Sequence, residues 1–409
     1  MKTIGRKNCW IIIILGVLGQ IAWGLENNWF NTYTYDVITT NPEPIAWMNA
    51  ASAITATITT FVMGTLSDRI GKRKPFIKYG YIIWGIFTGG FVICQFMPTV
   101  ASRIFMVVLL DCVMTFFGST ANDACLNAWT TDISNESNRG TITSLMQMTP
   151  LIAGLILASA GVIIDNFGYI VFFVGAGALV SLSGLLVGSI LQDDPNLKPN
   201  KNANKHLFKE IIEAFKIDSI KQNKNLFLIL SSLCVLLVAF QIAYPYEMIY
   251  ANQYLNIPKT TATLLTALGL PVMVIASIVA GKRCDQNKGT GILWLSPLLL
   301  CIGGIFHGLA KNIPLVLIAR AFIYAGWMMM TVAGTAMFKN LTPEESRGKY
   351  EGIRMIFVVM LPMIIGPQIG ATLINKYDIS PVIYYAMAVV SLFTYIILFV
   401  LHRQQKDTC

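Results

Sequence analysis

Charged residues are scarce in this sequence. They make up 12% of its 409 residues, while the hydrophobic fraction is 55% and the mean hydropathy is +0.61. A soluble domain carries about 25% charged residues. Several enzyme motifs are missing as well, since the sequence has no G-x-x-x-x-G-K-(S/T), no H-E-x-x-H and no G-x-S-x-G. We therefore expect no ATP-driven machine, and an intramembrane enzyme is an alternative that no motif supports.

Paired cysteines are missing too. The eight cysteines are scattered, mostly inside apolar runs, and none belongs to a C-x-x-C pair. We interpret them as reduced packing residues. The sequence thus predicts no disulfide, no metal site and no cofactor.

Long apolar runs dominate the chain instead. About twelve of them have the roughly 20-residue length of a membrane-spanning helix. They are continuous rather than alternating, which argues against a strand barrel. We predict an all-α membrane protein whose twelve transmembrane helices are 10–35, 44–66, 76–97, 101–129, 141–164, 169–191, 226–250, 259–280, 290–309, 313–338, 350–374 and 380–401.

The basic residues predict the orientation of these spans. Twelve spans place both termini on one side, and with that side in the cytoplasm all but five of the 30 Lys and Arg residues lie inside. The first run follows Lys2, Arg6 and Lys7 and precedes many others, so we expect a span rather than a cleaved signal. This bias also explains the net charge of +9 without nucleic acid as a partner. We predict a monomeric, multi-pass protein of the plasma (inner) membrane with both termini cytoplasmic.

Residues 192–225 form the one clear linker. They include Pro195, Pro199 and many charged residues, with an amphipathic helix pattern at 208–215 that would lie along the inner membrane surface. The linker divides the spans six and six. We therefore predict an N-terminal half 1–191, a cytoplasmic linker 192–225 and a C-terminal half 226–409.

One sequence pattern occurs twice. Gln20–Tyr33 and Gln241–Tyr254 both fit Q-I-A-(W/Y)-x-x-E-x-x-(W/Y)-x-N-x-Y. Each copy places a glutamate, Glu26 or Glu247, in a long apolar run. A carboxylate there costs about 2.5–3.5 kcal/mol on insertion scales, so it indicates a functional site. Its recurrence in both halves favours a site built symmetrically between them.

Three further features recur in the same order. Gly64-x-x-x-Asp68 returns as Gly281-x-x-x-Asp285, Arg103 returns as Arg320, and Glu136-x-x-Arg139 returns as Glu344-x-x-Arg347. The period is half the chain. The two halves are therefore expected to be pseudo-symmetric.

The loop after the second run carries a recognisable motif. Its residues Gly64-Thr65-Leu66-Ser67-Asp68-Arg69-Ile70-Gly71-Lys72-Arg73-Lys74 resemble the signature G-x-L-(A/S)-D-R-x-G-R-(K/R) of the major facilitator superfamily. A degenerate second copy begins at Gly281 and has Gln286 in place of the arginine. Its contacts with the other half should therefore be weaker. The resemblance covers the whole chain. It implies the major facilitator fold, with spans 1 and 7 facing each other across a central cavity.

We assign these loop features a gating role. Gly64 would let two helices approach, Gly71 would permit a tight turn, and Asp68 would sit at the positive N-terminal end of a helix from the other half, near Gly348. Arg69 and Arg139 would pair with carboxylates such as Glu136. The predicted gating residues are Gly64, Asp68, Arg69, Gly71, Arg73, Glu136, Arg139, Gly281, Asp285, Glu344 and Arg347. The alternative is that Lys72, Arg73 and Lys74 only anchor the topology.

Helical spacing places Trp23, Glu26, Trp29 and Tyr33 on one face of span 1, and the second copy does the same on span 7. The predicted substrate-binding residues are Gln20, Trp23, Glu26, Trp29, Asn31, Tyr33, Gln241, Tyr244, Glu247, Tyr250, Asn252 and Tyr254. For the aromatic residues alone, an interfacial belt is the alternative.

We predict that ion pairs within each half perform ion coupling. Glu26 would pair with Arg103 and Glu247 with Arg320, and making and breaking such a pair would load and release a proton. The alternative is a permanent ion pair that fixes the outer gate.

Span 4 contains two more acids, Asp111 and Asp123, which we add to the ion-coupling residues. The region Asn122–Trp129 is similar to span 4 of the glycoside–pentoside–hexuronide:cation symporters and the related sucrose transporters, where an acid helps to bind the coupling cation. The sodium-using members also carry acids in span 2, whereas 44–66 has none here. A proton is therefore preferred over sodium.

The sequence predicts a secondary transporter of a small polar solute, a sugar or glycoside, by alternating access. Aromatic faces would cover the apolar faces of the solute, and acids and amides would bind its hydroxyls. The alternative is a proton-coupled exporter of cationic or amphipathic compounds. Such exporters have G-P-x-x-G in span 5, whereas Gly366-Pro367-Gln368-Ile369-Gly370 lies in span 11. A non-transporting sensor would usually carry an added signalling domain, which the sequence lacks.

Overall fold

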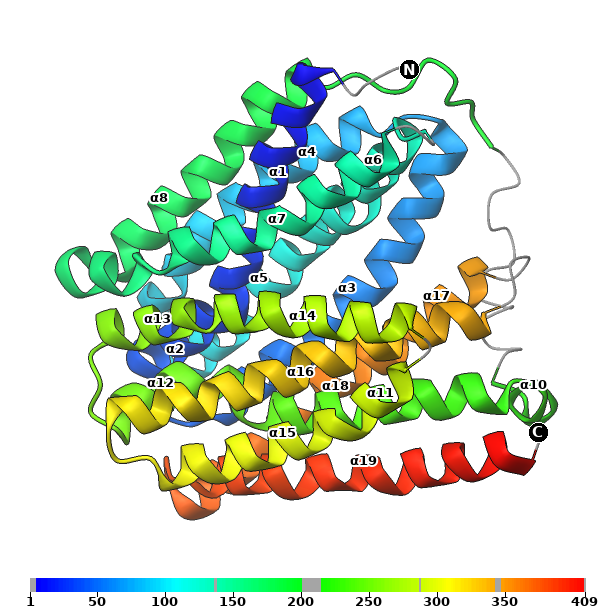
Figure 1. Ribbon diagram of the computed structural model, residues 1–409. Coiled ribbons are helices and arrows are strands. Elements are labelled where there is room, and N and C mark those ends of the chain that lie inside the picture. Colours follow the sequence, from blue (N-terminus) through cyan, green and yellow to red (C-terminus); the bar gives the residue numbers. More distant parts are fainter. Residues whose placement is uncertain (1–4, 136–137, 201–214, 287, 343–346, 408–409) are drawn as a thin grey trace. The chain divides into compact units, whose positions relative to one another are not determined.

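Helices account for nearly all of the regular structure. The computed structural model describes residues 5–135, 138–200, 215–286, 288–342 and 347–407, and within these ranges it contains no strand (Figure 1). Among the described residues, twelve helical segments are long and apolar enough to cross a membrane. The predicted all-α architecture with twelve transmembrane helices is confirmed. The spans are Arg6–Ile38, Glu43–Ile70, Lys74–Phe96, Val100–Asp132, Arg139–Leu157, Ala160–Ile190, Lys224–Gln253, Lys259–Asp285, Gly289–Leu309, Ile313–Leu341, Tyr350–Tyr377 and Val382–Arg403.

The chain divides into two compact units. Unit 1 comprises Met1–Lys205 and Pro258–Ala267, and unit 2 comprises His206–Ile257 and Leu268–Cys409. The predicted halves, 1–191 and 226–409, and the linker 192–225 stay a prediction. Most of the amphipathic helix expected at 208–215 lies outside the described residues.

Unit 1 is built from the first six spans and a short helix that follows the seventh. Its elements are α1 (Arg6–Gly24), η1 (Leu25–Phe30), α2 (Asn31–Tyr33), η2 (Thr34–Ile38), α3 (Glu43–Ile70), α4 (Lys74–Gly90), η3 (Phe91–Phe96), α5 (Val100–Gly118), η4 (Ser119–Leu126), α6 (Asn127–Asp132), α7 (Arg139–Leu157), α8 (Ala160–Ile190) and most of α13 (Lys259–Leu268).

Unit 2 contains the remaining spans. Its elements are α10 (Ile217–Gln222), α11 (Lys224–Ala243), η5 (Tyr244–Tyr246), α12 (Glu247–Gln253), α14 (Leu270–Asp285), α15 (Gly289–Leu309), α16 (Ile313–Leu341), α17 (Arg347–Met355), η7 (Ile356–Met360), α18 (Leu361–Tyr377) and α19 (Val382–Asp407).

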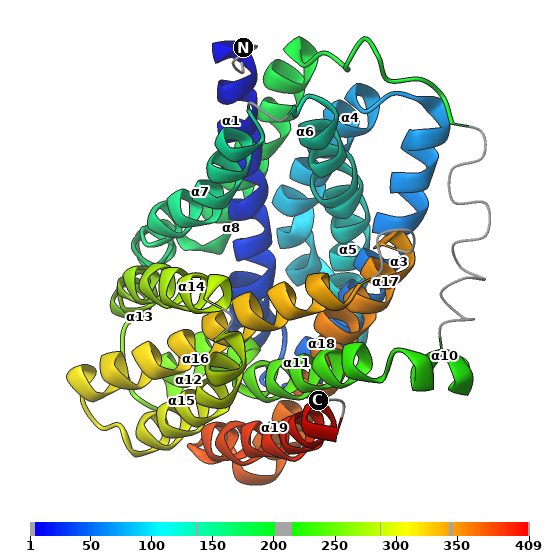
Figure 2. The same cartoon turned by 45° about the vertical axis from the view of Figure 1, so that its right-hand side comes forward.

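Close helix packing in unit 1 depends on glycine. Helices α4 and α8 lie side by side in both views (Figures 1 and 2). A Cβ at Gly85 would lie 2.3 Å from the carbonyl oxygen of Gly177, and a Cβ at Gly177 would lie 2.4 Å from that of Gly85. Only residues without a side chain allow this approach, which is the usual way in which membrane helices pack closely.

Local signals set several helix ends. Helix α3 ends at Gly71, whose φ of +68° is left-handed and suits glycine. Thr99 caps α5 in a capping box with Ser102. The side chain of Asn312 accepts the backbone N–H of Leu315 at 3.0 Å and so caps α16.

Two spans contain wider π-helical turns close to their acidic residues. Segment η1 includes Glu26 in the first span, and η4 includes Asp123 in the fourth. In the seventh span, the 3₁₀ turn η5 contains Pro245 and directly precedes Glu247. Such irregular turns are frequent at functional sites. They also shift the side chains that follow away from the face that regular helical spacing predicts.

Candidate functional site

Glu26 lies in a hydroxyl-lined environment inside unit 1. It is 6% exposed, and its Oε1 accepts hydrogen bonds from Ser52 of α3 and Thr115 of α5, the latter at 3.1 Å. The two hydroxyl oxygens are themselves 3.0 Å apart. The second carboxyl oxygen, Oε2, has no hydrogen-bond partner among the described residues. Three separate segments of unit 1 thus converge on this carboxyl group.

The other two predicted acids, Asp111 and Asp123, both lie in the fourth span, which also contains Thr115. Asp111 precedes Thr115 by one helical turn, is 1% exposed, and its Oδ1 has no partner in the described part of the chain. Asp123 accepts hydrogen bonds from Ser119 at 3.1 Å and Asn122 at 3.0 Å. Thr115 thus places Asp111 in the same region of unit 1 as Glu26.

The predicted Glu26–Arg103 pair is wrong. Arg103 lies near the start of α5, where its Nε donates to the carbonyl of Met97 at 2.9 Å. It precedes Thr115, which contacts Glu26, by three helical turns, or about 18 Å along the axis at 1.5 Å per residue. That is too far for an arginine side chain to span. No ion pair joins Glu26 or Asp111 to a basic residue in the ranges that the structure describes.

The structure contains the predicted contact between Glu247 and Arg320, inside unit 2. Arg320 Nη2 lies 3.0 Å from Glu247 Oε1, and the two side chains are 1% and 8% exposed. Tyr324, one turn further along α16, donates its hydroxyl to the two carboxyl oxygens at 3.0 and 3.3 Å. The repeated glutamates therefore have different partners, hydroxyl groups in unit 1 and an arginine in unit 2.

A small pocket adjoins this ion pair. Its free volume is about 250 Å³ when the open space at its mouth is counted, and the part within it has room for roughly one water molecule. Its walls include Tyr244, Tyr324, and His307 stacked on Tyr384 with ring centroids 3.9 Å apart. His307 is 1% exposed, and neither ring nitrogen has a hydrogen-bond partner among the described residues. A pocket of this size is not a solute site by itself.

The aromatic residues of the first repeat mostly pack inside unit 1. Trp29 packs edge-on against Phe172, with ring centroids 5.8 Å apart, and its side chain is 2% exposed. Tyr33 is fully buried against α8 and η3 and donates to the carbonyl of Val92 at 3.4 Å. Trp23 is partly exposed and lies 4.9 Å from Trp84. Of the first repeat's aromatic rings, Trp23 is thus the best placed to meet a solute.

The remaining predicted binding residues vary in exposure. Asn31 is buried and accepts the side chain of Asn49 at 3.2 Å, and Asn252 donates to the carbonyl of Ile257 at 3.3 Å. Tyr250 is buried and stacks at 5.0 Å on Tyr254, which is 42% exposed. The partly exposed side chains include Gln20, Trp23, Gln241 and Tyr244. Their role in binding stays a prediction.

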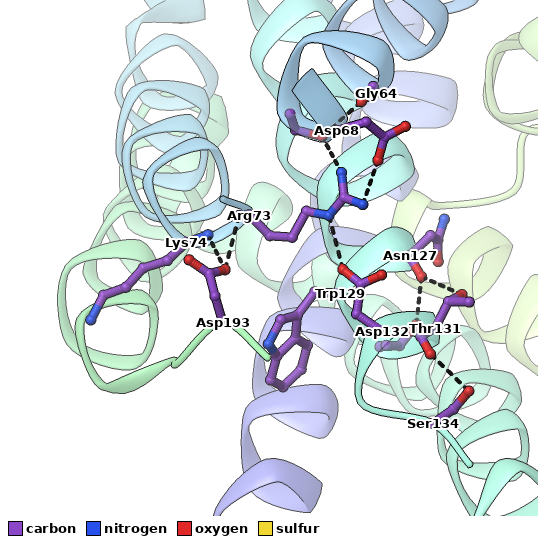
Figure 3. Close-up of polar contacts among 12 residues, drawn as sticks. Gly64, Asp68, Arg73, Lys74, Asn127, Trp129, Thr131, Asp132, Ser134 and Asp193 are labelled. Carbon is purple, nitrogen blue, oxygen red and sulfur yellow. Dashed lines mark hydrogen bonds and ion pairs between the residues drawn. The ribbon is translucent and has the colours of Figure 1, made fainter. Parts of the chain in front are cut away.

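The signature loop forms an ion network centred on Arg73, which is 4% exposed (Figure 3). Its guanidinium lies 2.5 Å from Asp68 and 3.0 Å from Asp132, and it donates to Ser67 at 2.5 Å. Burial alone would lower the pKa of Arg73, but the hydrogen bonds to Asp132 and Asp68 raise it above its usual value. The guanidinium is therefore charged at every pH at which the protein is folded.

The first linker residues also bind to this loop. Asp193 accepts the backbone N–H groups of Arg73 and Lys74, each at 2.9 Å, at the start of α4 (Figure 3). A carboxylate is stabilised at a helix N-terminus by the free N–H groups and the helix dipole. Trp129 donates to the carbonyl of Gln192 at 2.8 Å. This part of the linker is therefore an ordered part of unit 1.

The two loop glycines have different roles in the structure. The predicted tight turn at Gly71 is confirmed by its left-handed φ, and a Cβ there would lie 2.6 Å from the nitrogen of Pro199. A Cβ at Gly64 would lie 3.8 Å from Ala124, which is an ordinary contact. The prediction that Gly64 lets two helices approach stays a prediction.

Gly71→Ala is expected to destabilise the protein by at least about 1–2 kcal/mol, because alanine is strained in the left-handed region and its methyl group meets Pro199. Thermal unfolding of the purified protein in detergent would measure this. Gly64→Ala is the matched control and should unfold at the wild-type temperature. Equal unfolding temperatures for both variants would contradict this account of Gly71.

Several predicted gating residues are not tested by these contacts. Glu136 and Glu344 lie outside the described residues, as does the side chain of Arg347 at the start of α17. Arg69 and Arg139 are exposed, and so is Asp285 at the end of α14, four residues after Gly281. Their gating roles stay predictions, including the position of Asp68 near a helix of the other half.

Sequence reasoning missed five residues of these networks. Ser52 and Thr115 gave no signal, because hydroxyl residues are common in apolar helices. Tyr324 follows Arg320 by four residues, so helical spacing could have found it. Asp132 and Asp193 could have been found as acids close to a basic loop. His307, one turn from Gly303 inside α15, is interpreted from the sequence as a structural histidine near an outer loop.

The fold and its buried acids define a multi-pass membrane transporter rather than an enzyme. The sequence profile of the Major Facilitator Superfamily matches residues 10–295 and 239–408, and the chain belongs to this family. Members bind small molecules within the membrane. In the ranges described here, no group of three or more His, Cys, Asp or Glu side chains is placed to hold a metal ion.

Known proteins resemble this chain along most of its length. Sugar efflux transporter A of Dickeya chrysanthemi is 23% identical over 356 residues, which are 81% of this chain and 84% of that protein. Among solved structures, a D-xylose-proton symporter has a TM-score of 0.71 at 14% identity, covering 94% of this chain and 97% of the other. The nucleoside transporter NupG has a TM-score of 0.71 at 12% identity, covering 97% and 99%. At these identities, the structural likeness shows the fold.

Proposed function

We propose that this chain is a secondary active transporter of a small, hydroxyl-rich organic solute, a sugar or glycoside. It works by alternating access and couples solute movement to a cation, with a proton preferred over sodium. The observation that carries the proposal is Glu26, a carboxyl group buried at membrane depth among hydroxyl groups, without an ion-pair partner in the described chain. Such a group can take up and release a cation without first breaking an ion pair.

The choice of a sugar-like solute has two independent supports. A curated relative is named a sugar efflux transporter, and a structure with the same fold is a D-xylose-proton symporter. In this chain, Trp23 and Tyr244 are partly exposed rings, and Gln20 and Gln241 are partly exposed amides at matching positions. Rings would cover the apolar faces of a pyranose while amides bind its hydroxyls.

The proposed setting is the plasma (inner) membrane, with a monomer whose termini both lie in the cytoplasm. The concentration of Lys and Arg in the predicted inner loops supports this orientation. The solute and a coupling proton are the expected partners, together with the surrounding lipid.

Transport by the purified protein in liposomes tests the proposal. We expect counterflow of at least one sugar or glycoside from a small panel, accompanied by proton movement when pH is varied and unchanged when sodium is varied. Loading the solute inside or outside the vesicles would give the direction. Proton movement that depends on cationic dyes and not on sugars would instead favour the exporter of cationic or amphipathic compounds.

Glu26→Gln is expected to abolish gradient-driven accumulation, because it removes the buried carboxylate from the coupling site, while solute counterflow without a gradient persists. Both rates are measured in the same vesicles. Asn166→Gln, a change on the exposed surface of unit 1, should leave both unaffected. Unaltered accumulation by Glu26→Gln would remove this residue from the coupling mechanism.

A further inference from the structure

The repeated glutamates lie in environments of opposite charge balance. In unit 2, Glu247 has Arg320 at 3.0 Å and a hydroxyl group from Tyr324. Its charge is compensated, and a proton on Glu247 would leave Arg320 as a buried cation without its ion pair. Removing one partner of a buried pair is strongly unfavourable. Glu247 is therefore held in an ion pair inside unit 2.

Unit 1 has two buried acids and no such compensation. Glu26 and Asp111 are 6% and 1% exposed, and no basic side chain forms an ion pair with either one in the described ranges. Asp111 lies one helical turn before Thr115 on α5, and Thr115 donates to Glu26, so the two carboxyl groups lie in the same hydroxyl-lined region. Two like charges buried side by side cannot both be ionised, so one of the groups carries a proton.

The other described groups around this pair supply no counter-charge. Ser52 faces it from α3 and Thr115 from α5, both as hydroxyls. Asp123 of η4 adds a further acid near Glu26, and the thiols of Cys94 and Cys112 lie near Asp111. The surroundings therefore favour protonation of the pair over ionisation of both its members.

The hydrogen bonds distinguish the two acids. Two hydroxyl groups donate to the same oxygen of Glu26, an arrangement that stabilises an ionised carboxylate. Asp111 has no such donors, and its Oδ1 has no hydrogen-bond partner within the described chain. A neutral carboxyl group tolerates this environment far better than an ionised one.

We propose that Glu26 and Asp111 form a site for a single proton, which resides on Asp111, and that the ion-paired Glu247 is not part of this site. This deepens the proposed function, on which it rests for the role of the proton in coupling. The site is built entirely within unit 1. One proton would then accompany each transport cycle, leaving Asp111 when water or solute reaches the pair.

Infrared spectroscopy of the purified protein at neutral pH tests the proposal without any solute. A protonated carboxyl group gives a C=O stretch above the amide band that shifts in heavy water. We expect this band in the wild-type protein and its loss in Asp111→Asn. It should persist in Glu26→Gln and in the matched controls Glu247→Gln and Asp123→Asn. If Asp111→Asn does not fold, Asp111→Glu should keep the band at a shifted frequency.

Three results obtained without added sodium would overturn the assignment. They are a wild-type protein without the band, a band lost in Glu26→Gln and kept in Asp111→Asn, and a band lost in Glu247→Gln. Disappearance of the band on adding sodium would also overturn the assignment. A sodium ion would then be bound in place of the proton, among the side chains of Glu26, Asp111, Ser52 and Thr115. The readout needs no solute, so an assigned band together with failed sugar transport would contradict only the proposed function.

Discussion

Arg320→Met is expected to destabilise the protein by about 3–5 kcal/mol, because it leaves Glu247 as a buried carboxylate with only Tyr324 as a donor. Methionine keeps most of the side-chain volume, so the loss of charge dominates over the loss of packing. The variant should unfold at a clearly lower temperature in detergent. Its solute counterflow should fall at the same time, since the seventh span is held to α16 by this pair.

Arg103→Met is the matched control, because Arg103 occupies the equivalent place in the sequence repeat. It is partly exposed and donates to one backbone carbonyl, so we expect a cost of about 1 kcal/mol or less. The double variant Arg320→Met with Glu247→Gln should regain much of the lost stability, because it removes the uncompensated charge. Equal destabilisation by both arginine changes, or no recovery in the double variant, would show that the ion pair is not what stabilises unit 2.

The second large effect is expected at the signature loop, where Arg73→Met should cost about 3 kcal/mol. Arg73 is buried and contacts Asp68, Asp132 and Ser67, so its removal leaves two carboxylates facing each other across an apolar side chain. Stability is measured by thermal unfolding. Transport should also decline, because the loop would lose its fixed shape.

Lys72→Met is the control that decides between a network and a topology anchor. Lys72 is exposed and adjacent to Arg73, so both changes remove one positive charge from the same loop. If the basic residues acted only as anchors, the two variants would behave alike, with a fraction of the protein inserted the wrong way round. We expect wild-type stability and orientation for Lys72→Met and a large loss of stability only for Arg73→Met.

The large-scale organisation was predictable from the sequence because it depends on strong and local signals. Apolar runs of spanning length determine where the helices are. Inside a membrane, an α-helix satisfies all of its backbone hydrogen bonds within one segment, so each span can be predicted from its own residues. The loop after the second run was recognised from its spacing, and Gly71 was correctly assigned to a tight turn. Glu26, Glu247 and Arg320 were found because charged residues in apolar runs are expensive and therefore rare.

The partners of these residues were less predictable, because a contact between spans depends on the depth at which each side chain lies. The repeat suggested an arginine partner at the equivalent position for each glutamate, Arg103 for Glu26 and Arg320 for Glu247. In the structure, Glu247 lies level with Arg320, whereas Glu26 lies level with Thr115, three turns beyond Arg103. The π-helical turns contribute to this difference, since Glu26 lies within one and Glu247 follows a 3₁₀ turn. The sequence does not show such changes of helical pitch.

The sequence by itself determined that this protein is a twelve-span transporter with an acid repeated in two halves, because hydrophobicity and rare buried charges can be read one residue at a time. Only the tertiary structure decided that one acid has hydroxyl neighbours and a second acid, while the other has an arginine. The charge of a buried group depends on everything within a few ångströms of it, and those neighbours come from helices that are far apart along the chain.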